Sequence, residues 1–177
     1  TLRGPTPDGF LAAPNEGRNV SAILGKAILA GRFSLSGARL SMQGTGDPWN
    51  RPSPTRAFAV ALHRFSWLTS LLTQGEDGAR EAMRLFLLWQ QTFRVWTPFP
   101  WGEEVLPRRL INLSISARRM AAHATPEEVL VLARSMAEQG RHLVRLNQSV
   151  AWQADRAVAL VTLGCVLSGR VGDSFRA

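Results

Sequence analysis

The segment from Thr125 to Gly169 constrains the fold most, because it joins a well-marked helix start to a long uncharged stretch. Thr125 can cap a free backbone N–H, Pro126 has no N–H to leave unpaired, and Glu128 can reach back to the cap residue. Apolar residues then recur every three or four positions, which predicts an amphipathic helix with one solvent-facing side. They are Val129, Leu132, Ala133, Met136, Leu143 and Leu146.

The stretch from Ala157 to Leu167 contains no charged residue. A helix that is apolar on every side is typical of a buried helix. The stretch is far shorter than the roughly 20 residues that cross a bilayer, so we predict no membrane span. We therefore predict an inner helix packed beneath the outer one. Cys165, the only cysteine, is expected to pack within it.

The rest of the sequence predicts further helices and one small hairpin. Apolar residues alternate on both sides of Ser36-Gly37, which indicates a β-hairpin near residues 32–42 closed by a glycine-containing turn. Helical periodicity elsewhere is bounded by proline starts and glycine stops. The predicted helices cover residues 17–30, 54–75, 77–94, 107–123, 126–146 and 157–167. The fold class is thus all-α, an up-and-down array of six helices with one hairpin.

We divide the chain into two parts on this basis. Residues 1–45 hold an extended arm, a short helix and the hairpin, and residues 46–177 hold the helical array. The chain lacks an initiator Met and opens on polar residues, so we expect a fragment cut from a longer protein.

The net charge of +8 suits an acidic partner, but its distribution argues against a nucleic-acid site. Residues 1–100 hold 11 basic and 6 acidic side chains, and no run of like charge exceeds two. A basic nucleic-acid-binding domain is therefore the least favoured function class.

Motifs for catalysis or cofactor binding are absent. The sequence has no Cys/His pair at metal spacing, no glycine-rich phosphate loop and no Gly-x-Ser-x-Gly elbow, so we expect no metal and no cofactor. The three histidines fall on three predicted helices. Glu138 lies four residues before His142, a spacing that fits either a surface pair or a tuned proton-transfer group.

Three tryptophans are candidates for ligand contact. Trp49, Trp96 and Trp101 lie beside prolines in predicted loops, where we expect exposure, whereas core packing is expected for Trp67 and Trp89. A flat apolar ring suits the C–H face of a sugar, so the three loop tryptophans are candidate stacking platforms.

Five motifs, in order and spacing, resemble the amino-terminal region of bacterial heparinase II/III family proteins. They are Leu2-Arg3-Gly4-Pro5-Thr6-Pro7-Asp8, Leu29-Ala30-Gly31-Arg32-Phe33, Gly46-Asp47-Pro48-Trp49, His63-Arg64-Phe65-Ser66-Trp67-Leu68 and Arg108-Arg109-Leu110-Ile111-Asn112. The resemblance implies part of an incomplete α/α toroid of helical hairpins. Further toroid helices and a carboxy-terminal β-sandwich would follow the fragment and form a polysaccharide cleft with it.

The same resemblance implies a polysaccharide lyase that acts by β-elimination on uronic-acid polysaccharides, in the bacterial periplasm. Asp155-Arg156-Ala157 stands where the family carries Gly-Asn-His, so no catalytic residue carries over and we expect the fragment alone to be inactive. The implied substrate-binding residues, for an acidic polysaccharide, are Trp49, Trp96, Trp101, His142 and Arg156. The alternative reading is a catalytically degenerate helical interaction module.

Overall fold

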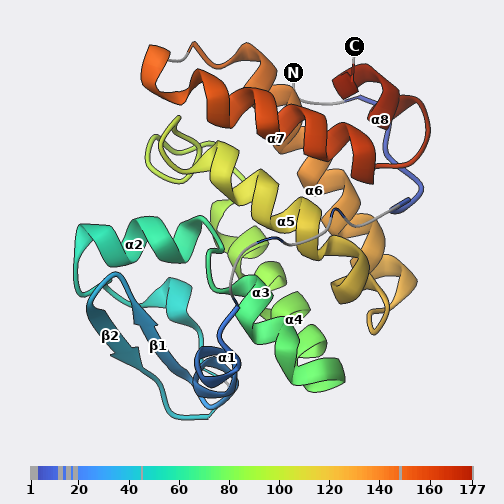
Figure 1. Cartoon of the computed structure of the whole chain (residues 1–177). Coiled ribbons are helices and arrows are strands. Elements are labelled where there is room, and N and C mark those ends of the chain that lie inside the picture. Colours follow the sequence, from blue (N-terminus) through green and yellow to red (C-terminus); the bar gives the residue numbers. More distant parts are fainter. Residues whose placement is uncertain are drawn as a thin grey trace.

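The computed structural model describes residues 4–11, 14, 17, 20–44, 46–147 and 149–176, and it is mostly helical with one two-stranded antiparallel sheet (Figure 1). The predicted all-α fold with a small hairpin is confirmed at this level. The α-helices are α1 (Ala22–Leu29), α2 (Arg56–His63), α3 (Leu68–Leu71), α4 (Gly75–Phe93), α5 (Leu106–Ala121), α6 (Pro126–Arg145), α7 (Gln153–Val166) and α8 (Gly169–Arg176). The strands are β1 (Arg32–Leu35) and β2 (Ala38–Ser41), and short 3-10 turns cover Pro48–Asn50, Leu72–Gln74 and Val150–Trp152.

Helix α5 occupies the centre of the molecule and packs against α3, α4, α6 and α7 (Figure 1). In the view of Figure 1, α7 lies above α5, whereas α3 and α4 lie below it. The prediction that the uncharged helix is the inner one is therefore wrong. Helix α7 buries one side, but Val158 and Val161 on its other side are 50% and 56% exposed, and Cys165 is exposed as well. That side of α7 therefore faces solvent.

The start of α6 forms as its sequence predicts. The Thr125 N–H donates to Glu128 Oε2 at 2.8 Å, and the Glu128 N–H donates to Thr125 Oγ1 at 3.3 Å. Pro126 occupies the first helical turn. This capping box satisfies two backbone donors that the helix itself leaves unpaired.

The hairpin also matches its prediction. Phe33 pairs with Leu40, and Leu35 pairs with Ala38. The turn residues Ser36 and Gly37 both have positive φ, 50° and 80°, as the tightest hairpin turns require. Phe33 and Leu35 are buried, and β1 packs against α1 and α2, which gives the small sheet the support that two strands need.

The predicted continuous helix over residues 54–75 is interrupted. Helix α2 ends at His63, Phe65 has a φ of +55°, and α3 begins at Leu68. The left-handed backbone lets the fully buried Phe65 ring meet Trp49 and Trp67 at 5.5 and 5.4 Å between centroids. Aromatic burial therefore outweighs helix continuity here. Helix α8 was not predicted at all.

Residues 4–11 of the extended arm cross the junction between α7 and α8. The Leu11 N–H donates to Val166 O at 2.8 Å, and the Ser168 N–H donates to Gly9 O at 3.1 Å. We call residues 4–11 the strap. It ties the first described segment to the last two helices.

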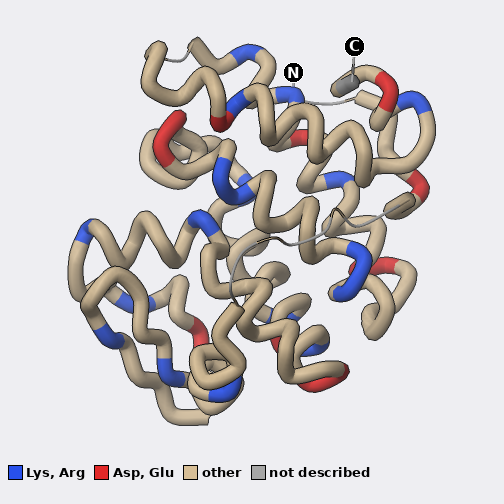
Figure 2. Tube along the Cα trace, in the orientation of Figure 1, with Lys and Arg blue, Asp and Glu red and all other residues tan. Residues whose placement is uncertain are grey.

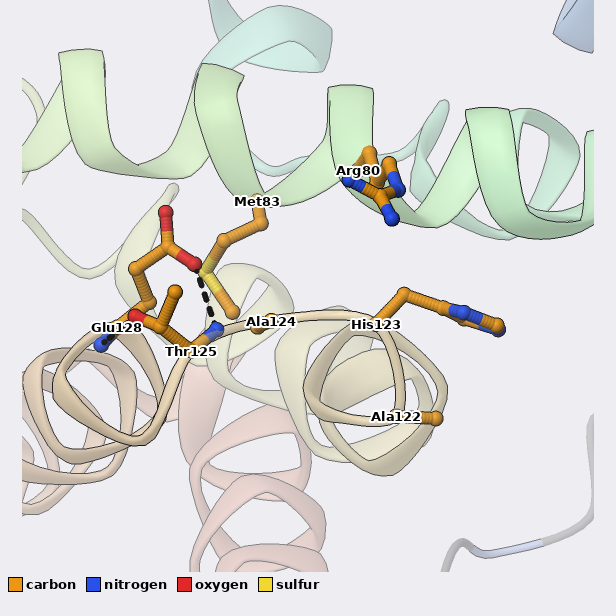
Figure 3. Close-up of a pocket in the computed structure, with 7 residues that line it drawn as sticks. All are labelled: Arg80, Met83, Ala122, His123, Ala124, Thr125 and Glu128. Carbon is orange, nitrogen blue, oxygen red and sulfur yellow. Dashed lines mark hydrogen bonds between the residues drawn. The ribbon is translucent and has the colours of Figure 1, made fainter.

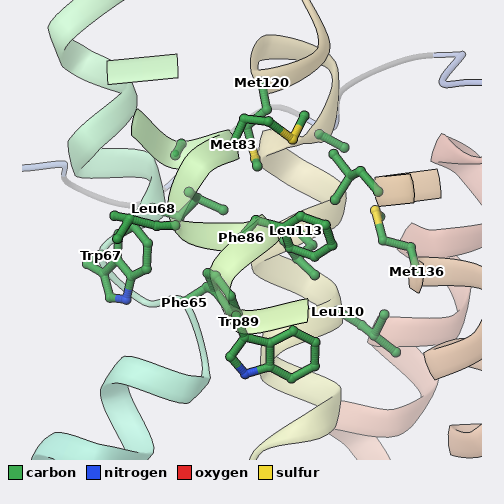
Figure 4. Packing of buried hydrophobic residues seen from close by; sticks show 14 of the residues in the cluster. Phe65, Trp67, Leu68, Met83, Phe86, Trp89, Leu110, Leu113, Met120 and Met136 are labelled. Carbon is green, nitrogen blue, oxygen red and sulfur yellow. The ribbon is translucent and has the colours of Figure 1, made fainter. Parts of the chain in front are cut away.

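An aromatic core fills the space between α3, α4 and α5 (Figure 4). Its labelled members include Phe65, Trp67, Phe86 and Trp89. His63 lies beside it at 7% exposure, where Nδ1 accepts a hydrogen bond from Trp89 Nε1 at 3.2 Å. Burial, followed by the positive charge of the nearby Arg109, lowers the pKa of His63 to about 3.

We predict that Gly25→Ala destabilises the fold, although alanine normally stabilises a helix interior by up to about 1 kcal/mol relative to glycine. A Cβ at Gly25 would overlap the carbonyl oxygen of Ser70, a backbone atom, where α1 packs against α3. We expect a loss of about 1–3 kcal/mol in the free energy of unfolding, measured by urea denaturation. Gly17→Ala is the control, because no atom lies within 4 Å of its added Cβ. Equal stability of the two variants would contradict this packing.

We predict that His63 makes the fold less stable as the pH falls below about 6.5. The unfolded state binds a proton near that pH, whereas the folded state holds His63 neutral until about pH 3, so stability is present above pH 6.5 and is lost on acidification. Between pH 6.5 and 5 the decrease in the free energy of unfolding should approach ~1.4 kcal/mol per pH unit.

His63→Gln should flatten this pH dependence, because a glutamine side chain does not titrate. Its amide oxygen can still accept the hydrogen bond from Trp89, so the fold is kept. Urea unfolding at pH 7, 6 and 5 measures it, a range in which most carboxylates stay ionised. His123→Gln is the control, because that side chain is 39% exposed. Parallel pH profiles for the wild type and His63→Gln would show that His63 is not the group responsible.

Candidate protein-docking groove

Helices α4 and α6 contact each other along one side of α5, and two hollows lie along their seam. Residues early in both helices line the first hollow, whereas residues at the end of α4 and in the middle of α6 line the second. The two helices therefore run in the same direction. The seam is therefore the place where two segments that are well separated in sequence, residues 90–95 and 131–138, present side chains together.

The first hollow has a volume of about 550 Å³, and Figure 3 shows the side chains that line it. Its charged groups already have partners. Arg80 binds Glu76 at 2.7 Å, and Glu128 is used by the capping box. His123 Nδ1 lies 3.9 Å from Glu76 Oε2. The lining residues are Arg80, Met83, Ala122, His123, Ala124, Thr125 and Glu128. Little charge is left for a ligand.

The second hollow is larger, about 820 Å³, and we call it the docking groove. Its lining residues are Gln90, Gln91, Arg94, Val95, Val131, Arg134 and Glu138. Arg94 and Arg134 are exposed, and neither side chain makes a hydrogen bond or ion pair with any residue that the structure describes. Val95 and Val131 are 68% and 39% exposed.

Free arginines beside exposed valines favour an acidic, partly apolar protein segment as the ligand of the groove. Two free guanidinium groups can each bind a carboxylate through paired N–H donors. The bare valines offer apolar contact beside them, and the two glutamines can bind backbone groups. Basic residues are otherwise spread over elements at both ends of the molecule (Figure 2). The groove is therefore distinguished by its unpaired arginines beside apolar surface and not by overall charge.

A buried chain of hydrogen bonds leads from the groove to the core. Ser135 Oγ donates to Gln90 Oε1 at 2.7 Å and accepts from Gln139 Nε2 at 3.0 Å. Gln139 Oε1 accepts from Arg109 Nε at 2.7 Å. The chain joins α4, α6 and α5, so it fixes the two walls of the groove relative to each other.

Arg109 is fully buried, although arginine is a residue type that is mostly exposed in folded proteins. Its Nη1 donates to Pro100 O at 2.7 Å, and the guanidinium carbon lies 4.3 Å from the Trp89 ring centroid. No carboxylate in the described residues pairs with it, and Nη2 has no hydrogen-bond partner. Burial lowers the pKa of Arg109 to about 9.

The predicted tryptophan sites differ in exposure. The expectation of exposed loop rings is wrong for Trp49 and Trp101, which are 7% and 2% exposed, and correct for Trp96, at 53%. Trp49 Nε1 donates to Leu85 O, and Trp101 Nε1 donates to Phe93 O, both at 2.8 Å. Each ring therefore joins a loop to α4. Trp96 directly follows Val95 of the docking groove.

The structure brings two of the predicted site residues together. His142 meets Trp101 edge to face, at 5.3 Å between ring centroids, and burial lowers the pKa of His142. Arg156 lies at the start of α7 and donates to Val144 O at 2.6 Å, which ties α7 to the end of α6. Ligand contact by the five predicted site residues stays a prediction. They are Trp49, Trp96, Trp101, His142 and Arg156.

The described residues show neither a metal cluster nor a membrane-crossing helix. No three histidine, cysteine or acidic side chains gather there at metal-binding distance. His63, His123 and His142 lie in the core, at the first hollow and against Trp101, so they form no common site. Among the helices that the structure describes, none combines the length and hydropathy that a bilayer crossing requires.

Comparison with known proteins gives one informative relative. Over 169 residues, 96% of this chain, the sequence is 43% identical to FtsZ-localized protein C of Caulobacter vibrioides. The chain spans only 29% of that protein's length. No protein-family model and no solved structure matches the chain.

These findings correct the resemblance to heparinase II/III proteins and what followed from it. No such family model matches, and the relative carries a name from cell division. The predicted lyase function, the acidic polysaccharide and β-sandwich partners, and the periplasmic location rested on that resemblance, and all are wrong by this comparison. The alternative reading, a helical interaction module, agrees better with the relative. This chain is therefore similar to an FtsZ-localized protein, and it carries a groove that is lined by basic and apolar side chains.

Proposed function

We propose that this chain is a helical interaction module of the FtsZ division assembly, with the docking groove as its binding site. The observation that carries the proposal is its 43% identity, over nearly its whole length, to a protein named for its localisation to FtsZ. We propose the same location for this chain. The chemistry of the groove supports a protein ligand, because Arg94 and Arg134 stand unpaired beside bare valine side chains.

The preferred ligand is an acidic segment with an apolar side, supplied by FtsZ or by a protein bound to it. A carboxylate that reaches Arg94 or Arg134 gains a charge-assisted hydrogen bond without displacing an internal partner. The apolar side of such a segment would cover Val95 and Val131. We include Trp96 in this surface, because it is half exposed and adjacent in sequence to Val95, and aromatic side chains are frequent anchors in protein interfaces.

A separate proposal concerns the division of the chain into two parts. We propose that residues 1–45 and 46–177 act as two parts, the first of which supports α2 and α3 while the second carries the groove. An arrangement of the helical hairpins as part of an α/α toroid stays a prediction about fold. Neither point is needed for the docking proposal.

We predict that reversing the two groove charges weakens binding to FtsZ. In a titration of fluorescently labelled chain with purified FtsZ of Caulobacter vibrioides, Arg94→Glu combined with Arg134→Glu should lower the affinity by about tenfold or more, equal to ~1.4 kcal/mol. The cause is loss of two favourable charge contacts and gain of two repulsive ones. Wild-type binding should also weaken as salt rises.

The matched control carries the same change of charge at another place. Arg32→Glu combined with Arg39→Glu alters two exposed arginines on the hairpin, far from α6. This variant should bind nearly as well as the wild type. Equal losses in both variants would reject the groove as the site and indicate non-specific charge attraction. Absence of wild-type binding to FtsZ, alone and in an extract that contains its partners, would reject the function.

A further inference from the structure

The buried chain of hydrogen bonds between the core and the docking groove has a direction, and Arg109 sets it. A guanidinium group carries only N–H donors and cannot accept a hydrogen bond. Arg109 Nε lies 2.7 Å from the side-chain amide of Gln139, so the amide atom that faces it must be the oxygen, Oε1. Both residues are fully buried, so bulk water does not supply another acceptor to Arg109 Nε.

Each following member of the chain is oriented by the one before it. Because Gln139 Oε1 is held by Arg109, Gln139 Nε2 points to Ser135 and donates to its Oγ at 3.0 Å. The Ser135 hydroxyl, which is itself buried, donates to Gln90 Oε1 at 2.7 Å. Turning the Gln90 amide over would place a donor where this hydroxyl needs an acceptor. The orientation of Gln90 therefore follows from a charged donor two side chains away.

Gln90 accordingly presents its amide N–H groups to the docking groove. Its side chain lines the groove from α4, and its oxygen is the atom held by Ser135. Its Nε2 has no hydrogen-bond partner among the residues that the structure describes, and it is not one of their buried unpaired atoms. Gln91 lines the same groove but is exposed, and its side chain makes no hydrogen bond to the described residues. Of the two neighbouring amides, only that of Gln90 has a fixed polarity.

We propose that the segment bound in the docking groove places an acceptor oxygen, from a carboxylate or a backbone carbonyl, against Gln90 Nε2. Since this ligand is the one named under the proposed function, the inference rests on that function. The three buried residues that precede Gln90 in the hydrogen-bond chain are positioning residues, because they act on the ligand only through Gln90. A ligand that offered a donor at this point would have to reverse a buried chain that begins at an obligate donor.

This polarity adds to the charge of the groove. Arg94 and Arg134 also only donate, so three polar groups of the groove require acceptor atoms on the ligand. A lysine side chain or a backbone N–H placed against Gln90 would find no acceptor there. Specificity depends on such mismatches as much as on favourable contacts. The groove therefore selects its ligand by the positions of acceptor atoms as well as by net charge.

Amide exchange in the free chain tests the orientation of Gln90 without FtsZ. In NMR spectra of the isotope-labelled chain, the side-chain N–H groups of Gln139 should exchange slowly with water, because they are buried. Those of Gln90 should exchange rapidly, because they face the groove. The Gln90 signals are identified by their absence in Gln90→Glu. Exchange of Gln90 as slow as that of Gln139 would show that its amide donates inward, and would overturn the inference.

Binding to FtsZ tests whether the ligand uses this donor. Gln90→Glu keeps one oxygen for Ser135 and turns a second oxygen toward the ligand acceptor, so the affinity should fall by about tenfold or more. Gln91→Glu is the matched control, because it adds the same charge to the same groove, also within one helical turn of Arg94. Its loss should be clearly smaller. Normal wild-type binding with equal losses in both variants would reject the polarity of Gln90 alone, whereas absence of wild-type binding would reject the proposed function itself.

A double-mutant cycle tests the positioning role of Ser135. Ser135→Ala frees the Gln90 amide to turn, so the affinity for FtsZ should fall by about threefold through lost preorganisation. The same change in a Gln90→Ala background should have almost no effect, because Ser135 then has no donor to position. Ser116→Ala is the matched control, since it deletes a buried hydroxyl that has no hydrogen-bond partner. Equal losses from Ser135→Ala in both backgrounds would indicate a merely structural role and would overturn the proposed positioning.

Discussion

The placement of Arg109 is the constraint on which most of the architecture depends. A cation with no carboxylate partner is costly to bury, and the fold offsets this cost with several weaker interactions. Gln139 and the Pro100 carbonyl accept its hydrogen bonds, and the Trp89 ring lies against its face. These residues come from α6, the connector before α5, and α4. Because each must be in place to solvate the same guanidinium group, Arg109 fixes three separate segments around α5.

Local signals in the sequence predict local structure well in this chain. The capping box at Thr125 and the Ser36-Gly37 turn involve residues within a few positions of each other, and both form as expected. Such features depend on short-range hydrogen bonds and on backbone conformation, which the residues themselves determine. The helical class of the fold follows from the same kind of signal.

Features set by tertiary contact were not predictable in this way. The break at Phe65 depends on aromatic rings from distant segments, and the burial of Trp49 and Trp101 depends on carbonyl groups of α4 that accept from them. The docking groove is of the same kind. Arg94 and Arg134 are ordinary helix-surface arginines in the sequence, and only the side-by-side packing of α4 and α6 makes them neighbours. A family resemblance built from short motifs gave no warning of this surface.

The strap has a consequence for the order of folding. The Asp8 N–H donates to Ser168 Oγ at 3.1 Å, across 160 residues of chain. Closing so long a loop costs conformational entropy. A few hydrogen bonds can offset this cost only after the rest of the loop is already compact. The strap should therefore dock last, on a finished α7–α8 junction, and detach first. Hydrogen exchange of the Leu11 amide would then report this local opening separately from global unfolding.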